Sequence, residues 1–353
     1  MKNHNKLIVS GACLLTAVGA TGTLAAQSLQ LLTDYQQIAT IPVPGGLAGF
    51  DISWVDSANG RYYLADRTAT AGTGRIDVID TQTLKFLYAI PQDTTGTAFV
   101  GNTGSGAKSG PNGVVAIPYL NQLYVGDGDS TVKVVDLTMK SIVATIPTGG
   151  KFRADELAYD PLDHIVMIAN PSDNPPFLTF ISTDTQKILG TLNYLNQSGL
   201  EQAVWDGQVN RFLISVPASG GSGGSVDRID PIAMQRTDRF FLSCSPSGLA
   251  LGPLQHVMPA CGDLIDGRNG LHLAFSQGYG DQTLSGDEIW FNPGDNRYYF
   301  GAASVGVVDA ETNYPLGFVT FAGGHSIAVD SETNRIFVPV TGVGVKVFAR
   351  TVN

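Results

Sequence analysis

A strand–turn–strand pattern recurs seven times along the chain, and this repetition limits the fold more than any other feature. The first copy reads FDISWVDSANGRYYLAD, and the copies begin at Phe50, Asn112, Ala154, Leu200, Pro246, Gly286 and Gly324. A second hairpin follows most copies, and its first strand usually ends in Asp before a Thr-containing turn, as in IDVIDTQTLKFLYAI. Asp and Thr side chains hydrogen-bond the backbone of such turns. Because a period of roughly 40 to 50 residues is typical of β-propellers, we expect an all-β fold of seven four-stranded blades.

The repeat region is incomplete at both ends. The last copy of the second hairpin stops after one strand, GVKVFARTVN, whereas an unpaired strand, YQQIATIPV, precedes the first repeat. A closed ring accounts for both, because the N-terminal strand can complete the last blade and remove an open sheet edge. An open β-solenoid or a pair of sandwiches is the alternative.

The first 25 residues have the features of a secretory signal peptide. Lys2 and Lys6 precede a long apolar stretch, and small residues suitable for cleavage follow at Ala25 and Ala26. No later segment approaches the roughly 20 apolar residues that a membrane span needs. We therefore expect residues 26–353 to form a single propeller domain that is exported, either to a periplasm or out of the cell.

The charge of the chain limits its partners. The leader contains two of the 21 basic residues and none of the 31 acidic ones, so the mature chain has a net charge near −12. Such a surface repels nucleic acid and anionic lipid and favours cations or neutral ligands. We expect no nucleic-acid partner.

Two cysteines remain after the leader, Cys244 and Cys261. Cys244 precedes the first strand of the fifth repeat and Cys261 ends the second, so an antiparallel hairpin brings them close. In an oxidising compartment an even pair predicts a disulfide. A thiol pair that binds a metal is the alternative.

Two segments, NQLYVGDGDSTVKVVDLTMKSIVATIPTG and NRIFVPVTGVGVKVF, resemble YVTN-type repeats. Such repeats build seven-bladed propellers that include lactonase-like proteins and the heavy subunits of periplasmic quinoprotein amine dehydrogenases. The resemblance covers essentially the whole mature chain. It implies the scaffold, and proteins with this scaffold have unrelated functions.

Polar side chains recur where the first strand of each repeat begins. In a propeller this strand borders the central channel, so its first residue lies at one opening. The aligned residues are Asp51, Gly113, Asp155, Glu201, Ser247, Asp287 and His325, with Asn112 one position before Gly113, and Glu156, Gln202 and Glu288 one position later in their repeats. We expect these side chains to converge on one channel opening.

Carboxylates crowded in a narrow opening raise one another's pKa values or recruit a cation. Oxygen-rich clusters bind Ca²⁺ or Mg²⁺, and one added His also admits Mn²⁺ or Zn²⁺. We predict Asp51, Asp155 and Glu201 as ligands of a divalent cation. The alternative is that these side chains cap turn amides and are solvated separately around a wide funnel.

Two further families show a similar arrangement. Asp51, Asn112, Asp155 and Glu201 resemble the Glu, Asn and Asp that hold a divalent ion at the channel mouth of six-bladed gluconolactonase-type propellers. Streptogramin-lyase-type propellers pair a carboxylate with a His near the axis. The second resemblance implies an acid/base pair made by Asp287 or Glu288 with His325.

Three residues are candidates for contacting a small-molecule ligand: Asn112, Arg67 on the turn between the second and third strands, and Arg153. The segment GNTGSGAKSG, residues 101–110, has one residue too many before Lys108 to be a phosphate-binding loop. We expect it to be a long loop on the channel face, where it could cover a ligand.

These features favour a hydrolase or lyase that acts on a small lactone-like or cyclic ester substrate at the channel mouth. A divalent ion would polarise the carbonyl, and a carboxylate or His325 would transfer the proton. The alternative is a non-enzymatic module that binds a ligand or a protein partner, because the chain has no complete catalytic motif and repeat scaffolds often serve as binding surfaces.

Overall fold

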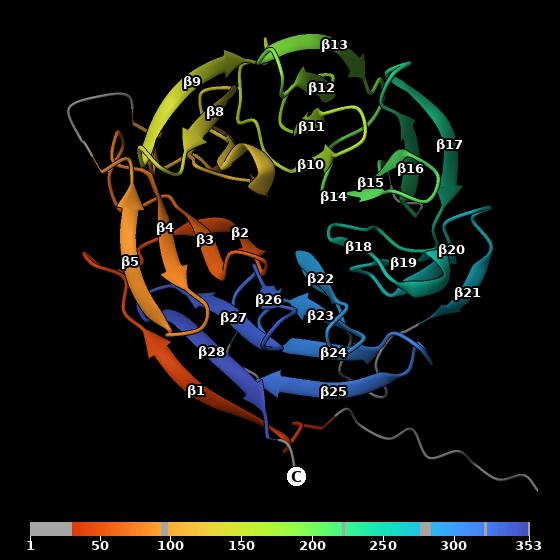
Figure 1. Cartoon of the computed structure of the whole chain (residues 1–353). Coiled ribbons are helices and arrows are strands. Elements are labelled where there is room, and N and C mark those ends of the chain that lie inside the picture. The colour runs from red at the N-terminus through yellow and green to blue at the C-terminus, as the bar shows by residue number, and fades with distance from the viewer. Residues whose placement is uncertain (1–29, 93–97, 221–222, 276–283, 321–322, 352–353) are drawn as a thin grey trace, which may run out of the picture.

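The computed structural model describes residues 30–92, 98–220, 223–275, 284–320 and 323–351. Within these ranges the strands form seven antiparallel sheets of four strands each, arranged as blades around a central axis (Figure 1). The predicted all-β, seven-bladed propeller is confirmed. The predicted signal peptide lies outside the described residues.

Each blade runs from an inner strand at the axis to an outer strand at the rim. Blade one contains β2 (Phe50–Asp56), β3 (Arg61–Asp66), β4 (Arg75–Asp80) and β5 (Lys85–Ile90). Blade two contains β6 (Val114–Ile117), β7 (Gln122–Gly126), β8 (Thr131–Asp136) and β9 (Ser141–Pro147). Blade three contains β10 (Leu157–Asp160), β11 (Ile165–Asn170), β12 (Phe177–Ser182) and β13 (Lys187–Asn193). Blade four contains β14 (Ala203–Asp206), β15 (Arg211–Val216), β16 (Ser225–Asp230) and β17 (Gln235–Phe241).

The remaining blades follow the same order. Blade five contains β18 (Leu249–Leu251), β19 (His256–Pro259), β20 (Asp263–Asp266) and β21 (His272–Phe275). Blade six contains β22 (Glu288–Asn292), β23 (Arg297–Gly301), β24 (Val305–Asp309) and β25 (Pro315–Thr320). Blade seven contains β26 (Ala328–Asp330), β27 (Arg335–Val340), β28 (Gly344–Arg350) and β1 (Tyr35–Ile41). Short 3₁₀ helices occur at Gly106–Lys108 (η1), Pro118–Leu120 (η2) and Pro253–Gln255 (η3).

The N-terminal strand closes the ring, as predicted. β1 pairs antiparallel with β28, from Tyr35 opposite Arg350 to Ile41 opposite Val345. Figure 1 shows the red-orange β1 beside the blue β28, so the two ends of the described chain meet in one sheet. This pairing covers the edge that β28 would otherwise expose.

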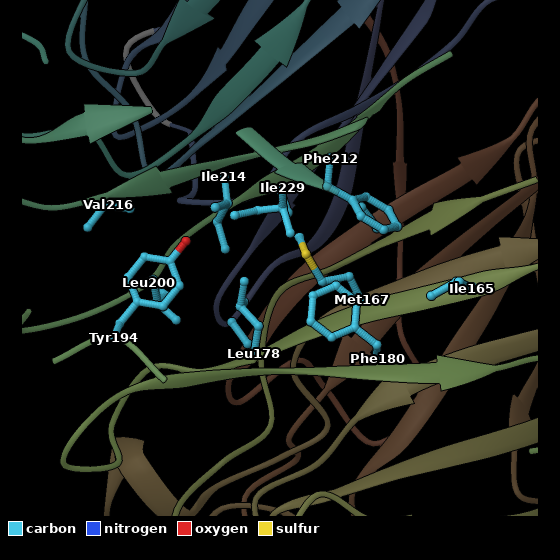
Figure 2. Close-up of a cluster of buried hydrophobic side chains, with 13 residues drawn as sticks. Ile165, Met167, Leu178, Phe180, Tyr194, Leu200, Phe212, Ile214, Val216 and Ile229 are labelled. Atoms are coloured by element: carbon cyan, nitrogen blue, oxygen red, sulfur yellow. The ribbon is translucent and has the colours of Figure 1, made fainter. Parts of the chain in front are cut away.

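The core lies between neighbouring blades rather than along the axis. β11, in the middle of its blade, is buried along its whole length, whereas the outer strand β13 is mostly exposed. Figure 2 shows Met167 and Phe180 of blade three packed against Phe212 and Ile229 of blade four. Burying each such side chain contributes about 1.5–3 kcal/mol. The middle strands of neighbouring blades are therefore packed against one another.

The recurring Asp and Thr residues stabilise the hairpin turns as expected. Asp80 ends β4, and its Oδ1 accepts hydrogen bonds from the backbone N–H of Thr83 at 2.7 Å and from Thr83 Oγ1 at 2.9 Å. Asp309 and Thr312 repeat the arrangement in blade six. Such local bonds fix where each strand ends.

Cys244 and Cys261 form a disulfide, which confirms the predicted pairing. Cys244 precedes β18 and Cys261 follows β19, and their Cα atoms lie 6.0 Å apart. Among the described residues, no helix is long and apolar enough to cross a membrane.

Candidate functional site

Backbone pairing shows which residues are equivalent at the start of the inner strands. The N–H groups of Asn112, Asp155, Glu201 and Asp287 each donate to the second strand of their own blade, at 2.9 to 3.0 Å. Asn112 therefore occupies the position assigned above to Gly113, and the predicted alignment of the second repeat was wrong by one residue. The alignment error arose because the inner strand of the second repeat ends at Ile117 and Pro118 instead of at an Asp or Asn.

Gly113 instead stands where Glu156 and Gln202 stand in the next two blades. A Cβ atom on Gly113 would lie 2.2 Å from the carbonyl oxygen of Asp155. The close approach of blades two and three therefore requires glycine at this position.

Eight side chains at the channel opening make up what we call the charged ring. They are Asp51, Arg67, Asn112, Arg153, Asp155, Glu201, Asp287 and His325. One residue further along the inner strands lies a second layer, made of Glu156, Gln202, Glu288 and Ser326. The ring contains two guanidinium groups as well as carboxyl groups, so it is not purely acidic.

Arg67 joins the first two blades at the opening. It hydrogen-bonds the carboxylate of Asp51, and its Nε donates to Asn112 Oδ1 at 3.2 Å. Asn112 is fully buried and donates from Nδ2 to the carbonyl of Ala154 at 3.0 Å. Burial raises the pKa of Asp51, but the opposite effect of Arg67, His325 and Arg153 is larger and holds that pKa below its usual value. Asp51 is therefore an ionised carboxylate at neutral pH.

His325 faces the same carboxylate from blade seven. Its Nε2 lies 3.5 Å from Asp51 Oδ1, and its ring stacks on Phe50 with centroids 4.6 Å apart and an interplanar angle of 8°. The His325 side chain is 37% exposed. The imidazole is thus oriented by two contacts while one edge faces the opening.

Arg153 and Asp155 pair on blade three, with Nη2 2.6 Å from Oδ2. The backbone N–H of Arg153 donates to the carbonyl of Ala107 at 2.8 Å, so the loop of residues 101–110 packs beside the ring. Burial raises the pKa of Asp155 to about 7, with Asp51 adding to the increase and Arg153 opposing it.

Glu201 extends this group on blade four. Burial, together with the carboxyl groups of Asp155 and Asp287, raises the pKa of Glu201 to about 8. The ring therefore holds an ionised Asp51 beside two carboxyl groups that titrate close to neutral pH.

The second layer contains two buried carboxyl groups, Glu156 and Glu288. Burial raises both pKa values well above the usual range, and the charge of Glu288 raises that of Glu156 further. Ser326 Oγ donates to Glu288 Oε2 at 3.0 Å and accepts from the backbone N–H of Ser53 at 2.9 Å. In both groups burial therefore favours the protonated form over the carboxylate.

Sequence reasoning missed Ser326 and Ser53. Ser326 directly follows His325 and aligns with Glu156, Gln202 and Glu288, so the repeat alignment carried a signal for it. The repeat alignment carried no signal for Ser53, because β2 has a register shift between Phe50 and Ser53 that breaks the simple spacing.

Gln202 ties blades four, five and six together below the ring. Its Oε1 accepts from the N–H groups of Leu249 at 2.7 Å and Ile289 at 3.1 Å, and its Nε2 donates to the carbonyl of Ile289 at 3.2 Å. These bonds fix the inner strands of three blades relative to one another.

The structure brings the predicted catalytic and ligand-binding residues to one opening, except that the Glu288 carboxyl lies one layer deeper than Asp287 and His325. Within the described ranges, no group of three or more His, Cys, Asp or Glu side chains is arranged to hold a metal ion. Of the three predicted ligands, Asp51 and Asp155 contact guanidinium groups. A divalent cation at this opening stays a prediction.

Comparisons with known proteins bear on the fold. No family model matches the sequence, and no curated protein matches it. The WD40 β-propeller domain of Doa1 superposes with a TM-score of 0.67 at 14% identity, over 91% of this chain and 98% of that one. Hydrazine synthase from Kuenenia stuttgartiensis superposes with a TM-score of 0.66 at 14% identity, over 89% of this chain and 98% of that one. Similarity at this level supports the propeller fold alone.

Proposed function

We propose that the protein is a hydrolase or lyase that acts on a small lactone-like or cyclic ester substrate at the charged ring. The observation that carries the proposal is the oriented pair of His325 and Asp51, beside carboxyl groups with pKa values of about 7 and 8. General acid–base catalysis is most effective when the pKa values of the catalytic groups lie near the working pH. Perturbed pKa values gathered in one opening are typical of catalytic sites.

The ionised Asp51 favours the tautomer of His325 with its proton on Nε2, which leaves Nδ1 as the base. In the hydrolysis we propose, Nδ1 takes a proton from water while the water oxygen forms a bond to the carbonyl carbon. The ester C–O bond then breaks, and the protonated Glu201 gives its proton to the leaving oxygen. Arg153, on the neighbouring blade, stabilises negative charge on the carbonyl oxygen.

The test is a panel of unsubstituted γ- and δ-lactones and cyclic carbonates, with acid release followed at constant pH. We expect turnover that falls by about 10²–10⁴-fold in His325→Gln, the usual range for loss of a general base. The proposal would be contradicted by a wild-type protein that hydrolyses none of these lactones and carbonates, or by a His325→Gln variant with full activity.

A divalent cation, with Ca²⁺, Mg²⁺, Mn²⁺ and Zn²⁺ as candidates, gives a metal-dependent form of the same reaction, in which Glu201 would be an ionised ligand instead of the acid. Glu201 and Asp287 are the ring carboxyl groups without a guanidinium contact among the described ion pairs, so they are available to a cation. Metal analysis of the purified protein, followed by assays with and without chelator, separates a metal-dependent reaction from one that uses the arginines.

Two finer assignments belong with this function. The repeat segments quoted above support placing the chain among YVTN-type, lactonase-like propellers. The leader-like N-terminus supports export to an oxidising compartment, and the disulfide between Cys244 and Cys261 is compatible with it. N-terminal sequencing of secreted or periplasmic material tests the second point.

A non-enzymatic ligand-binding or protein-binding propeller is the second candidate. The observation in its favour is that Arg67 and Arg153 already neutralise Asp51 and Asp155, so much of the ring is internally paired. Binding of a partner that persists in Asp155→Asn and His325→Gln, without turnover of any lactone, would favour this candidate.

A further inference from the structure

A cavity lies inside the propeller, with a volume of about 380 Å³. Six of the seven inner strands line it, and among its walls are Trp54 of β2, Tyr159 of β10, Trp205 of β14 and Phe291 of β22. These residues lie near the ends of their strands, whereas the charged ring lies at the starts. From Glu201 to Trp205 the chain advances about 13 Å along one strand. The cavity therefore extends from just below the second layer toward the opposite end of the channel.

Its chemistry also differs from that of the ring. Of the described residues that line it, none is charged, and Gln202 is the one amide side chain. Gln202 is engaged by the backbone of Leu249 and Ile289, so it separates the cavity from the ring rather than offering a polar contact. Burial raises the pKa values of Glu156 and Glu288 above it, which favours their uncharged forms. A charged ligand would find no partner here.

All three tryptophans of the chain line this one cavity. Trp54 and Trp290 meet edge to face with ring centroids 5.3 Å apart, and Trp205 packs against Phe212 at 4.9 Å. None of the three is fully buried, and each lines the cavity. Aromatic surface left accessible in a concave site favours stacking with a planar apolar ligand.

We propose that this cavity binds a small, neutral, aromatic molecule. A volume of about 380 Å³ lies within the ~300–1,000 Å³ range of small-molecule pockets and cannot hold a folded segment of another protein. Uncharged, mostly apolar walls favour a neutral, apolar guest over an ion. The site is independent of the reaction proposed at the charged ring.

The experiment titrates the purified protein with N-phenyl-1-naphthylamine, a neutral aromatic probe whose fluorescence rises in apolar surroundings. Because every tryptophan lines the cavity, tryptophan emission should fall as probe emission rises, with one probe bound per chain. The anionic analogue 8-anilinonaphthalene-1-sulfonate should bind at least about tenfold more weakly.

Two variants fill the cavity from different blades. Val204→Phe acts from β14 and Leu251→Trp from β18, and each should weaken probe binding by about tenfold or more. The matched control is Val143→Phe, the same change at an exposed position on the outer strand β9, which should bind as the wild type does. Circular dichroism and thermal melts show that each variant is folded.

Three results would overturn the proposal: no binding of the neutral probe to the wild type, unchanged binding in whichever cavity-filling variant folds, or equal binding of the anionic analogue. Failure of the lactone assay has no bearing on this test, because the charged ring and the cavity are probed by different ligands.

Discussion

The guanidinium of Arg153 contacts the carboxyl group of Asp155 at 2.6 Å, yet the pKa of Asp155 is raised to about 7. A cation this close ordinarily lowers the pKa of a carboxyl group. Here burial and the neighbouring Asp51 outweigh it, because several carboxyl groups share two guanidinium groups within one narrow opening. The protonation state of the ring is therefore set by the whole cluster and not by any single pair.

Stability should fall as the pH rises through the neutral range. Asp155 and Glu201 have pKa values of about 7 and 8 in the folded protein and ordinary values when unfolded, so the folded state binds more protons between about pH 4 and 8. The stability that these two groups contribute is fully present below their pKa values in the unfolded protein. It is lost as the pH rises through their pKa values in the folded protein. Each pKa unit corresponds to about 1.4 kcal/mol.

Thermal melts at about pH 5, 7 and 9 measure this effect. Glu201→Gln should flatten the profile and melt higher than the wild type at the alkaline end. Identical pH profiles for Glu201→Gln and the wild type would show that Glu201 has an ordinary pKa.

His325→Gln should reduce lactone turnover by about 10²–10⁴-fold with little change in melting temperature. The side chain is 37% exposed, and Asp51 keeps its contact with Arg67, so no buried polar group is left unpaired. The chain offers a matched control in His164, which is 40% exposed and pairs with Asp184 at 2.9 Å, away from the ring. His164→Gln should keep full activity, and equal losses in the two variants would point to a general effect on folding.

Arg67→Met should destabilise the protein by about 3–5 kcal/mol, because it leaves the Asp51 carboxylate buried without its strongest partner. Arg61→Met is the control: Arg61 pairs with Asp80 at 2.8 Å but is 34% exposed, and an exposed pair contributes about 0–1 kcal/mol. Urea unfolding of both variants provides the comparison. Equal losses would mean that Arg67 acts as an ordinary surface residue.

Gly113→Ala should destabilise the protein by about 1–3 kcal/mol, since the added methyl group would lie 2.2 Å from the Asp155 carbonyl oxygen and push blades two and three apart. Gly49→Ala serves as the control, because a methyl group there meets nothing within 4 Å. The midpoint of denaturant unfolding measures both. A Gly113→Ala midpoint equal to that of Gly49→Ala would contradict the blade contact.

Removing the disulfide by Cys244→Ala with Cys261→Ala should lower stability by about 3 kcal/mol, as expected for a cross-link that closes a loop of 17 residues. In the denatured, unreduced wild-type protein, neither Cys244 nor Cys261 should react with a thiol reagent. Labelling of both cysteines without reductant would exclude the bridge.

The candidate site was only partly predictable from the repeats. The positions of Asp51, Asp155, Glu201, Asp287 and His325 at one opening followed from the alignment, because each stands at the same distance from the Asp or Asn that ends its strand. Asn112 was misplaced by one residue, since its repeat lacks that marker. The pairing of Arg67 with Asp51 and Asn112 could not be predicted, because it depends on how far blades one and two approach each other.

By itself, the sequence determined the seven blades, the closing strand and the disulfide. These depend on alternating side chains, Asx turns and hairpin spacing, all of which act over a few residues and repeat along the chain. Only the tertiary structure decided which carboxyl groups are ionised and where the tryptophans gather. Burial and charge contacts at the axis join residues from blades far apart in sequence, and a pKa depends on all the groups nearby in space rather than on neighbours along the chain.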